Sequence, residues 1–293
     1  MIIIRLMGGL GNQMFQYSLG KNLSIKNNTV LKIDKSWFDQ ESNQFRKYEL
    51  DIFAISAASA SPQEISTLKY KRGIRGRLKK ITDRYRPYYR RSWVKQQGMY
   101  FDLNILKAGD NSYIDGYWQS EKYFKEIKNE LLEEFRLTGE LDEANRQMLD
   151  KIFKVNSAGI HIRRGDYVKN KKTNEFHGTC SIDYYNEAVR IINNEISQVH
   201  WFVFSDEINW AKINLKLPGE TTFVDINNDK NYGDLILMSK CKHQIIANSS
   251  FSWWAAWLNN YKQKIVIAPR KWFNLEPENF KIEDLIPDSW KKI

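Results

Sequence analysis

The chain has 293 residues, 42% of them hydrophobic, and a formal net charge of +10. This length suits one large or two medium domains, and the hydrophobic content supports a packed core, which excludes a disordered chain. The first apolar run is four residues long and ends at Arg5, which argues against a signal peptide, and no stretch reaches the roughly 18 apolar residues of a membrane span. Two cysteines, Cys180 and Cys241, cannot build a disulfide framework, and we expect a cytoplasmic protein.

The N-terminal segment predicts a strand, a glycine loop, a helix and a second strand. "IIIRL" precedes "MGGLGNQ", Phe15, Leu19 and Leu23 then follow at helical spacing, and "TVLKID" ends at Asp34. Glycines before a helix N-terminus favour a phosphate, although a tight turn without a ligand fits them as well. Asp34 lies about 20 residues further on, where dinucleotide-binding proteins place a ribose-binding carboxylate, but the dinucleotide-binding pattern is incomplete because Met14 occupies the place of its third glycine.

Residues 69–95 carry the whole basic surplus, with twelve Lys and Arg and one acid. The apolar residues at helical spacing in this segment are Ile74, Leu78, Ile81 and Tyr85. The pattern predicts a basic amphipathic helix that ends before Pro87. Three surroundings fit such a helix: an anionic membrane surface, a polyanion such as nucleic acid, or the body of the domain itself, against which the apolar stripe would pack.

The second half of the chain predicts a parallel sheet wrapped by helices. Apolar runs "AGIHIR", "HWFVFS", "TTFVDI", "HQIIAN" and "KIVIA" alternate with helical stretches that begin near Ser181, Asp206, Tyr232 and Ser250. Before it, "SEKYFKEIKNELLEEFRL" predicts a helix. We place a domain boundary near residue 150, giving domains 1–150 and 151–293. Two such α/β halves predict a central cleft, with ligands at the carboxyl ends of the strands.

The motif "GIHIRRGDYV" carries charge where a buried strand ends. Residues alternate sides along a strand, so His161 and Arg163 share one direction while Arg164 starts on the other, and Gly165 allows a sharp turn. An arginine at this position matches phosphate oxygens with its planar fork. The alternative is an internal ion pair, for example Arg164 with Asp166, or a latch between the domains. Asp166 is also a candidate base.

Two further strand ends carry polar residues. "IIANSSFSWWAAWL" predicts a strand, helix-capping residues at Asn248, Ser249 and Ser250, and a helix whose N-terminus offers a second anion site. We interpret its tryptophans as core rather than as stacking platforms. In "FSDE", Ser205 and Asp206 follow a strand, and the carboxylate suits guanine N–H groups or ribose hydroxyls, whereas a helix N-cap explains it equally well.

A metal site is not predicted. His177 and Cys180, and Cys241 and His243, are pairs without the regular spacing of zinc motifs. The chain also lacks a D-x-D triplet, a pattern that commonly holds a divalent cation. We therefore expect no cofactor and no bound metal.

Taken together, the motifs resemble those of the alpha-1,2-fucosyltransferases of glycosyltransferase family 11. The matching motifs, in chain order, are "GGLGNQMFQY", "GYWQSEKYF", "HIRRGDY", "EFHGTCSIDYY", "FSDE" and "IIANSSFSWWAAWL", and they extend from residue 8 to about 258. The ordered set is far more specific than any single motif. The resemblance implies a GT-B type fold of two Rossmann-like domains, and transfer of L-fucose from GDP-fucose to a sugar hydroxyl with inversion at C1 and without a metal.

The resemblance also implies a donor site in the C-terminal domain. Arg163 would bind the β-phosphate, the backbone around His161 and the Asp206 carboxylate would hold guanine, and Ser249 and Ser250 would close the diphosphate site. From the N-terminal, acceptor-side domain, the glycine loop would line the diphosphate. The full set of donor-binding residues is Gly9, Gly11, Asn12, His161, Arg163, Ser205, Asp206, Ser249 and Ser250.

The base that deprotonates the acceptor is assigned first to Asp166, within the strongest motif. Glu175 and His177, expected in the following loop, are the alternatives, and Arg164 is expected to orient its neighbours. Asp166 itself also fits a role in orienting an arginine.

The resemblance implies a galactose-terminated glycan as the acceptor, in bacterial surface polysaccharide synthesis of the O-antigen type, and a lipid-linked form of this glycan fits as well. The basic segment then becomes a docking surface for an anionic membrane or a pyrophosphate-linked acceptor, and we expect peripheral attachment to the inner face of the membrane. Two rival functions compete with this interpretation, a nucleic-acid-binding protein that uses the basic segment and an NAD-dependent oxidoreductase.

Overall fold

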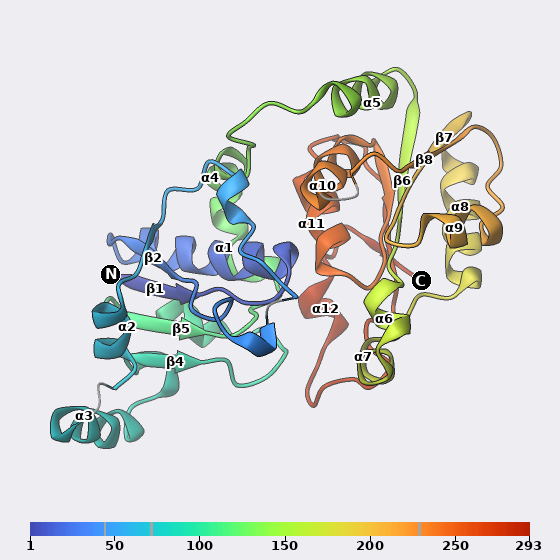
Figure 1. The fold of residues 1–293 in the computed structure, drawn as a ribbon. Coiled ribbons are helices and arrows are strands. Elements are labelled where there is room, and N and C mark those ends of the chain that lie inside the picture. Colours follow the sequence, from blue (N-terminus) through green and yellow to red (C-terminus); the bar gives the residue numbers. More distant parts are fainter. Residues whose placement is uncertain (44, 71–72, 228–229) are drawn as a thin grey trace. The chain divides into compact units, whose positions relative to one another are not determined.

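The computed structural model describes residues 1–43, 45–70, 73–227 and 230–293, except for the side chains of Arg75, Asp166, Lys169 and Lys172. It divides into two compact units, each with its own sheet (Figure 1). Unit 1 comprises Met1–Gly139 and Glu278–Leu285, and unit 2 comprises Glu140–Pro277 and Ile286–Ile293. The division therefore falls between residues 139 and 140, earlier than the position near 150, and the C-terminal part of the chain contributes to both units.

Unit 1 is built on a parallel five-stranded sheet in the order β3-β2-β1-β5-β4. Its strands are β1 (Ile2–Arg5), β2 (Leu31–Asp34), β3 (Ala58–Ser59), β4 (Trp93–Lys95) and β5 (Ser112–Asp115). The chain runs outward from the central β1 to β2 and β3, and β5 and β4 lie on the other side of β1. The direction of winding therefore reverses between β1 and β5, where α/β sheets commonly bind ligands.

The helices of unit 1 include one predicted helix that is much shorter than expected. They are α1 (Leu10–Lys26), α2 (Pro62–Leu68), α3 (Ile74–Arg84), α4 (Lys128–Glu134) and α12 (Ile282–Leu285), with 3-10 turns at Glu41–Asn43, Leu50–Ile52, Tyr88–Arg90, Leu103–Lys107, Glu121–Tyr123 and Lys125–Ile127. Only α4 forms an α-helix within the predicted helix of residues 120–137. Phe124 interrupts it with a non-helical backbone (φ −148°) while its buried ring packs 6.0 Å from that of Phe15.

The predicted basic amphipathic helix is α3, and its apolar stripe does not pack on unit 1. Ile74 is 77% exposed, Leu78 and Ile81 are each 57% exposed, and Tyr85, at the end of the helix, is 86% exposed. The alternative in which this stripe packs against its own domain is therefore wrong. Figure 1 shows α3 at the periphery of unit 1.

Unit 2 is built on a parallel six-stranded sheet in the order β11-β10-β9-β6-β7-β8. Its strands are β6 (Asn156–Ile162), β7 (Val199–Ser205), β8 (Thr221–Val224), β9 (His243–Ile245), β10 (Val266–Ala268) and β11 (Lys291–Lys292). The first five coincide with the predicted apolar runs. The chain winds from β6 to β8 on one side and from β9 to β11 on the other, so the switch point lies between β6 and β9.

The helices of unit 2 confirm the predicted alternation. They are α5 (Glu143–Phe153), α6 (Gly165–Lys169), α7 (Lys171–His177), α8 (Ile182–Glu195), α9 (Ile208–Asn214), α10 (Asn231–Lys240) and α11 (Ser250–Leu258). Trp253, Trp254 and Trp257 of α11 are at most 3% exposed, which confirms that they belong to the core. Among the described residues, no helix is both long and apolar enough to cross a membrane.

A buried polar network holds α5 on unit 2. The amides of Asn145 and Asn227 exchange two hydrogen bonds of 2.8 and 3.0 Å, and Asn227 also donates to the Asp234 carboxylate at 2.8 Å. Burial raises the pKa of Asp234 to about 6, although the bond from Asn227 opposes the increase. The network explains why α5 belongs to unit 2 although it precedes the first strand of that unit. The two doubly wound sheets confirm the predicted α/β class with two Rossmann-like halves.

Candidate functional site

Two adjacent strands of unit 2 deliver an ion pair to the carboxyl edge of the sheet. β6 and β7 are paired in register, Ile162 opposite Ser205, so the residues that follow them leave the sheet side by side. Arg163 Nη1 lies 2.8 Å from Asp206 Oδ2, and both side chains are 24% exposed. The charge at the end of this strand is therefore paired and still accessible to a ligand.

Arg164 is held by a separate set of contacts. Its Nε donates to Glu207 Oε2 at 3.1 Å, and its guanidinium stacks 3.8 Å from the ring centroid of Trp210. Its backbone N–H donates to Asp206 Oδ1 at 2.9 Å. Arg164 is thus paired with Glu207 from the neighbouring strand end, whereas the predicted pair with Asp166 involves a side chain outside the described part, and the two arginines have different contacts.

Asp206 is not a helix N-cap, contrary to the alternative reading of "FSDE". The N-cap position of α9 is Glu207, whose side chain makes no capping bond, and its backbone N–H donates to Ser205 Oγ at 3.0 Å. The Asp206 carboxylate points instead to the β6 side, where it accepts from Arg163 and from the Arg164 backbone. Ser205 and Asp206 therefore stabilise the chain where β6 and β7 end, and they do not cap α9.

The backbone at Gly165 passes close to the Asp206 carboxylate. A Cβ at this position would lie 2.7 Å from Asp206 Oδ2, inside van der Waals contact. We expect Gly165→Ala to displace the carboxylate from both of its arginine contacts and to lower kcat/KM for the donor by roughly 10-fold or more. Steady-state kinetics check this, with Gly109→Ala as the matched control, because among the described residues no atom beyond its chain neighbours lies within 4 Å of a Cβ there. Equal activities of the two variants would contradict the role given to Asp206.

His161 is buried beside this ion pair and is neutral at pH 7. It is 6% exposed, and its ring lies 5.4 Å from that of Phe251 at the start of α11. Burial lowers the pKa of His161 to about 4, with Arg163 adding to the decrease and Asp206 opposing it. Its Nδ1 has no hydrogen-bond partner among the described residues, and its carbonyl accepts from the Tyr185 hydroxyl at 3.1 Å.

The N-terminus of α11 lies at the switch point of the sheet. β9 pairs with β6, and the contact between His161 and Phe251 brings the start of α11 next to the end of β6. Ser249 is the N-cap, as predicted, and its Oγ accepts from the Phe251 N–H at 3.3 Å. Ser250 begins the helix, and the first turn contains no acidic residue. This helix end therefore keeps the positive dipole that attracts an anion.

Glu175 and His177 lie in α7 and not in a loop. The Asn170 side chain accepts from the Thr173 N–H at 3.1 Å and begins the helix, and Gly178, at φ +64°, follows its end. Glu175 is exposed. The His177 ring is stacked on Tyr167 with centroids 4.8 Å apart and planes 12° from parallel, so it is fixed by packing rather than carried on a loop.

Asn248, which was predicted only as a capping residue, instead ties this helix to the segment before α11, a role that the sequence did not indicate. Its Nδ2 donates to the carbonyls of His177, Gly178 and Trp272 at 3.0 to 3.2 Å, and its Oδ1 accepts from the Cys180 thiol at 3.6 Å. Asn248 is 3% exposed. This buried amide, with both its Nδ2 and Oδ1 engaged, ties residues 177–180 and Trp272 to the segment that precedes α11. The side chain of Asp166 lies outside the described part, although its backbone belongs to α6.

In unit 1, the glycine loop follows β1 at the corresponding switch point. Gly8 takes φ +77°, a conformation that favours glycine, while Gly9 is extended and serves as the N-cap of α1 without a side-chain bond. Gly11 lies within the first turn of α1. Asn12 Oδ1 accepts from the Gln119 amide at 2.7 Å, which links the glycine loop to the "GYWQ" motif after β5.

The comparison of this chain with known families decides its identity. A family model described as "Glycosyl transferase family 11" matches residues 1–293. The chain belongs to glycosyl transferase family 11. This glycosyltransferase is 35% identical to an alpha-1,2-colitosyltransferase of Escherichia coli, over 100% of this chain and 98% of the relative. It is 34% identical to the O-antigen biosynthesis glycosyltransferase WbnK of Escherichia coli, over 92% of this chain and 93% of the relative. It is 26% identical to the bovine galactoside alpha-(1,2)-fucosyltransferase 2, over 58% of this chain and 50% of the relative.

A carboxylate that would be needed by the nicotinamide alternative is already used inside the glycosyltransferase fold. Asp34, at the end of β2, is 1% exposed and accepts from the Tyr113 hydroxyl at 2.5 Å. Lys69 Nζ lies 3.6 Å from the same side chain. Burial raises the pKa of Asp34, but the hydrogen bonds from Tyr113 and Ser36 and the charge of Lys69 together lower it below its usual value. The carboxylate that would bind a ribose is thus engaged in the structure of unit 1. The family assignment excludes the alternative function as an NAD-dependent oxidoreductase.

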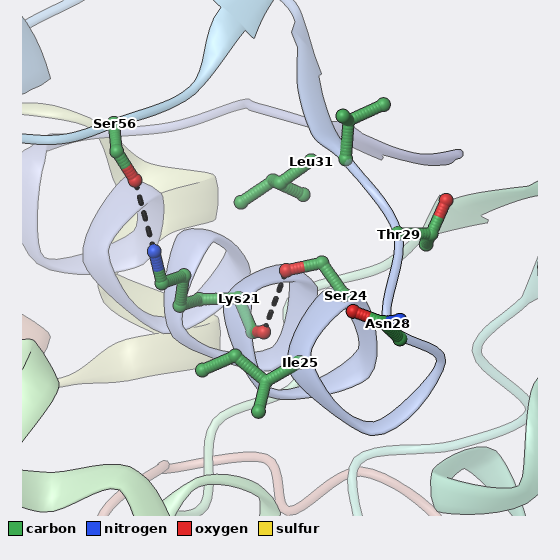
Figure 2. A pocket seen from close by; sticks show the side chains of 8 residues that line it. Lys21, Ser24, Ile25, Asn28, Thr29, Leu31 and Ser56 are labelled. Carbon is green, nitrogen blue, oxygen red and sulfur yellow. Dashed lines mark hydrogen bonds between the residues drawn. The ribbon is translucent and has the colours of Figure 1, made fainter.

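A second feature of unit 1 is a cavity of about 410 Å³ at the amino end of β2, away from the glycine loop (Figure 2). Lys21 reaches across it to donate to Ser56 Oγ at 2.9 Å and to Glu134 Oε1 at 2.6 Å. Ser24 Oγ donates to the Lys21 carbonyl at 2.8 Å. Because its polar groups bind one another, we assign this cavity to the structure of the glycosyltransferase and not to its site. Among the described residues, no group of three or more His, Cys, Asp or Glu is arranged to hold a metal ion.

Proposed function

We propose that this family 11 glycosyltransferase transfers L-fucose from GDP-fucose to the 2-hydroxyl of a galactoside, with inversion at C1. The observation that carries the proposal is the carboxyl edge of unit 2, where the Arg163–Asp206 pair, the fixed Arg164 and the start of α11 surround the switch point between β6 and β9. Guanidinium groups and a helix N-terminus at such a switch point are suited to binding a diphosphate.

We propose that different groups of this site contact different parts of the donor, according to their chemistry. Asp206 accepts hydrogen bonds only, so it fits the N1 and N2 hydrogens of guanine, while Arg163 contacts the β-phosphate. A guanidinium has five N–H donors, and Arg163 can bridge the carboxylate and a phosphate oxygen at once. Ser205, Ser249 and Ser250 add hydroxyl and backbone donors to this site, with the neutral imidazole of His161 behind it.

Three residues of the glycine loop, Gly9, Gly11 and Asn12, are assigned to the diphosphate from unit 1. The support is local to that unit: the loop opens at the switch point, Gly9 leaves the N-terminus of α1 without a side-chain cap, and the first turn of α1 holds no acid. The bond from Gln119 fixes the side chain of Asn12. These features provide backbone donors without a competing anion.

The reaction proposed is a single displacement. The acceptor 2-hydroxyl attacks C1 of fucose while the bond between C1 and the β-phosphate oxygen breaks, and the proton of the hydroxyl passes to a carboxylate or imidazole base. GDP leaves with increased negative charge, which Arg163 and the N-terminus of α11 stabilise without reorganising. Asp166 is the first candidate for the base, with Glu175 and His177 as alternatives.

The acceptor is proposed to be a galactose-terminated glycan in bacterial surface polysaccharide synthesis. The support is the similarity to the O-antigen glycosyltransferase WbnK over 92% of this chain. Attachment of the acceptor to a lipid and a cytoplasmic location at the inner membrane face stay predictions.

The choice of donor sugar is a first test of the function, because one relative is a colitosyltransferase and another a fucosyltransferase. Colitose is L-fucose without the 3-hydroxyl. We expect kcat/KM to be at least roughly 10-fold higher with GDP-fucose than with its 3-deoxy analogue. The polar groups that bind the 3-hydroxyl of fucose would have no hydrogen-bond partner in the complex with the analogue. Release of GDP measured with both donors, and with UDP-galactose as a control, checks this. Preference for the 3-deoxy donor would make this chain a colitosyltransferase instead.

Metal independence is a second expected result. Since arginines and a helix N-terminus stabilise the departing GDP in the proposed reaction, we expect EDTA to leave the initial rate unchanged within about twofold. Transfer is measured with and without EDTA, and again after adding Mg²⁺ or Mn²⁺ in excess. If EDTA abolished transfer and either metal restored it, the proposed charge stabilisation by protein groups alone would be wrong.

A further inference from the structure

Helix α3 is attached to unit 1 by its polar side. Asp83 is 2% exposed, and its Oδ2 accepts from the Ser92 N–H at 2.9 Å, from Ser92 Oγ at 3.1 Å and from the Tyr70 hydroxyl at 3.2 Å. Arg86 Nη1 lies 3.6 Å from its other oxygen. A carboxylate with this many donors is a fixed anchor, so the orientation of α3 about its own axis is determined.

The opposite side of the same helix presents its apolar residues to the surroundings. Ile74, Leu78, Ile81 and Tyr85 follow one another at steps of four, three and four residues, so they form one stripe along the helix. All four are more than half exposed. In an amphipathic helix of a water-soluble domain this stripe would face the core, whereas here the anchored carboxylate faces the core instead.

Basic side chains border the stripe on one flank. Arg77, Lys80 and Arg84 lie three and four residues apart and are all exposed. On the same side, a groove of about 440 Å³ opens between α3 and β4. Its described lining contains four cations, Lys80, Arg84, Arg91 and Lys95, and no carboxylate.

We propose that α3 docks on the surface of an anionic lipid bilayer. The apolar stripe enters the boundary between headgroups and acyl chains, and the basic flank and the groove receive lipid phosphates, an arrangement typical of interfacial helices. The proposal goes beyond the transfer reaction, because it concerns where the enzyme works and depends on no donor or acceptor contact.

Charge and hydrophobicity together favour this occupant over others. A nucleic acid would neutralise the basic flank but leave the apolar stripe in water, and a second copy of α3 would bring two basic flanks together. A bilayer with anionic headgroups satisfies both features at once. Because unit 1 holds the helix by Asp83, α3 can lie flat on such a surface without unfolding.

The experiment is sedimentation of the full chain with vesicles of phosphatidylcholine containing roughly 30% phosphatidylglycerol at about 0.15 M salt, compared with pure phosphatidylcholine. We expect binding to the anionic vesicles only. Each Lys or Arg at a membrane surface is worth about 1 kcal/mol, so removing three in Arg77→Gln/Lys80→Gln/Arg84→Gln should weaken binding roughly 100-fold. The stripe variant Ile74→Ser/Leu78→Ser/Ile81→Ser should weaken it at least roughly 10-fold.

Matched controls come from exposed residues elsewhere in the chain. Arg136→Gln/Arg146→Gln/Arg190→Gln removes the same charge, and Val30→Ser/Phe153→Ser/Ile213→Ser removes the same kind of apolar surface. Both should bind vesicles like the wild type. Thermal unfolding and transfer to a soluble acceptor verify that the α3 variants remain folded.

A second measurement locates the helix directly. An environment-sensitive fluorophore on Leu78→Cys should shift to the blue when anionic vesicles are added, while the same label on Ile213→Cys should not. The proposal is overturned if neither vesicle binds the chain, or if the stripe variant binds as well as the wild type. It is equally overturned if duplex DNA competes with the vesicles and binds the stripe variant as tightly as the wild type. The same holds if loss of self-association is the only effect of the stripe substitutions.

Discussion

Replacing Arg163 with lysine is expected to lower kcat roughly 10²- to 10³-fold, nearly as much as replacing it with alanine. Lysine keeps the positive charge, but its single ammonium group cannot hold the Asp206 carboxylate at 2.8 Å and contact a phosphate in the planar geometry of the guanidinium. The loss corresponds to that of one preorganised donor to a developing negative charge. Initial rates with saturating GDP-fucose measure it, because the effect is assigned to the leaving group.

The matched control is Arg190→Lys on α8. Arg190 forms an ion pair with Glu187 on the exposed surface of unit 2, away from the carboxyl edge of the sheet, and it should keep full activity. Similar thermal unfolding of the two lysine variants would show that both are folded. If Arg163→Lys kept most of its kcat while Arg163→Ala lost it, charge alone would suffice and bidentate binding of phosphate would be disproved.

Replacing the proposed catalytic base is expected to cause the second large decrease in kcat. We expect Asp166→Asn to lower kcat roughly 10²- to 10⁴-fold and to remove the acidic limb of the pH–rate profile, since asparagine cannot accept the acceptor proton. Glu175→Gln should remain near wild type. Steady-state kinetics from pH 5 to 9 separate a lost base from a lost binding contact, because only the base changes the shape of the profile.

His177 needs a variant that preserves its packing. The ring is stacked on Tyr167 and lies 5.6 Å from the Phe273 ring, so His177→Ala would leave a cavity as well as remove a base. His177→Phe keeps an aromatic ring without a proton acceptor. If His177→Phe lost several orders of magnitude in kcat while Asp166→Asn stayed near normal, the base would be His177, and Asp166 would serve only to orient an arginine.

The strand ends that carry the site were predictable from the sequence, whereas their pairing was not. Apolar runs followed by "RRGD", "SDE" and "NSS" place polar residues at one edge of a parallel sheet. The register between β6 and β7, which opposes Ile162 to Ser205, depends on long-range packing. Because of it, Arg163 meets Asp206 and Arg164 meets Glu207, partners that are about 43 residues away in the sequence.

Some features had local signals that were available but not used. Asn170 and Gly178 bracket α7 as an N-cap residue and a terminating glycine, so the helix that holds Glu175 and His177 was readable from the sequence. In contrast, the interruption at Phe124 and the three hydrogen bonds donated by Asn248 are tertiary effects. They depend on a buried ring and on carbonyls from two segments distant in the sequence, His177–Gly178 and Trp272. The outward orientation of the α3 stripe likewise depends on the burial of Asp83.

The measurement that tests the account most directly is the structure of the product. The chain is incubated with GDP-fucose and a β-galactoside acceptor, and the linkage and anomeric configuration are read by NMR. Inversion of the β-linked donor predicts an α-fucosyl residue on the galactose 2-hydroxyl, with one GDP released for each residue transferred. A β-linked product, attachment at another hydroxyl, or no transfer from GDP-fucose while the 3-deoxy donor reacts would contradict the proposed function.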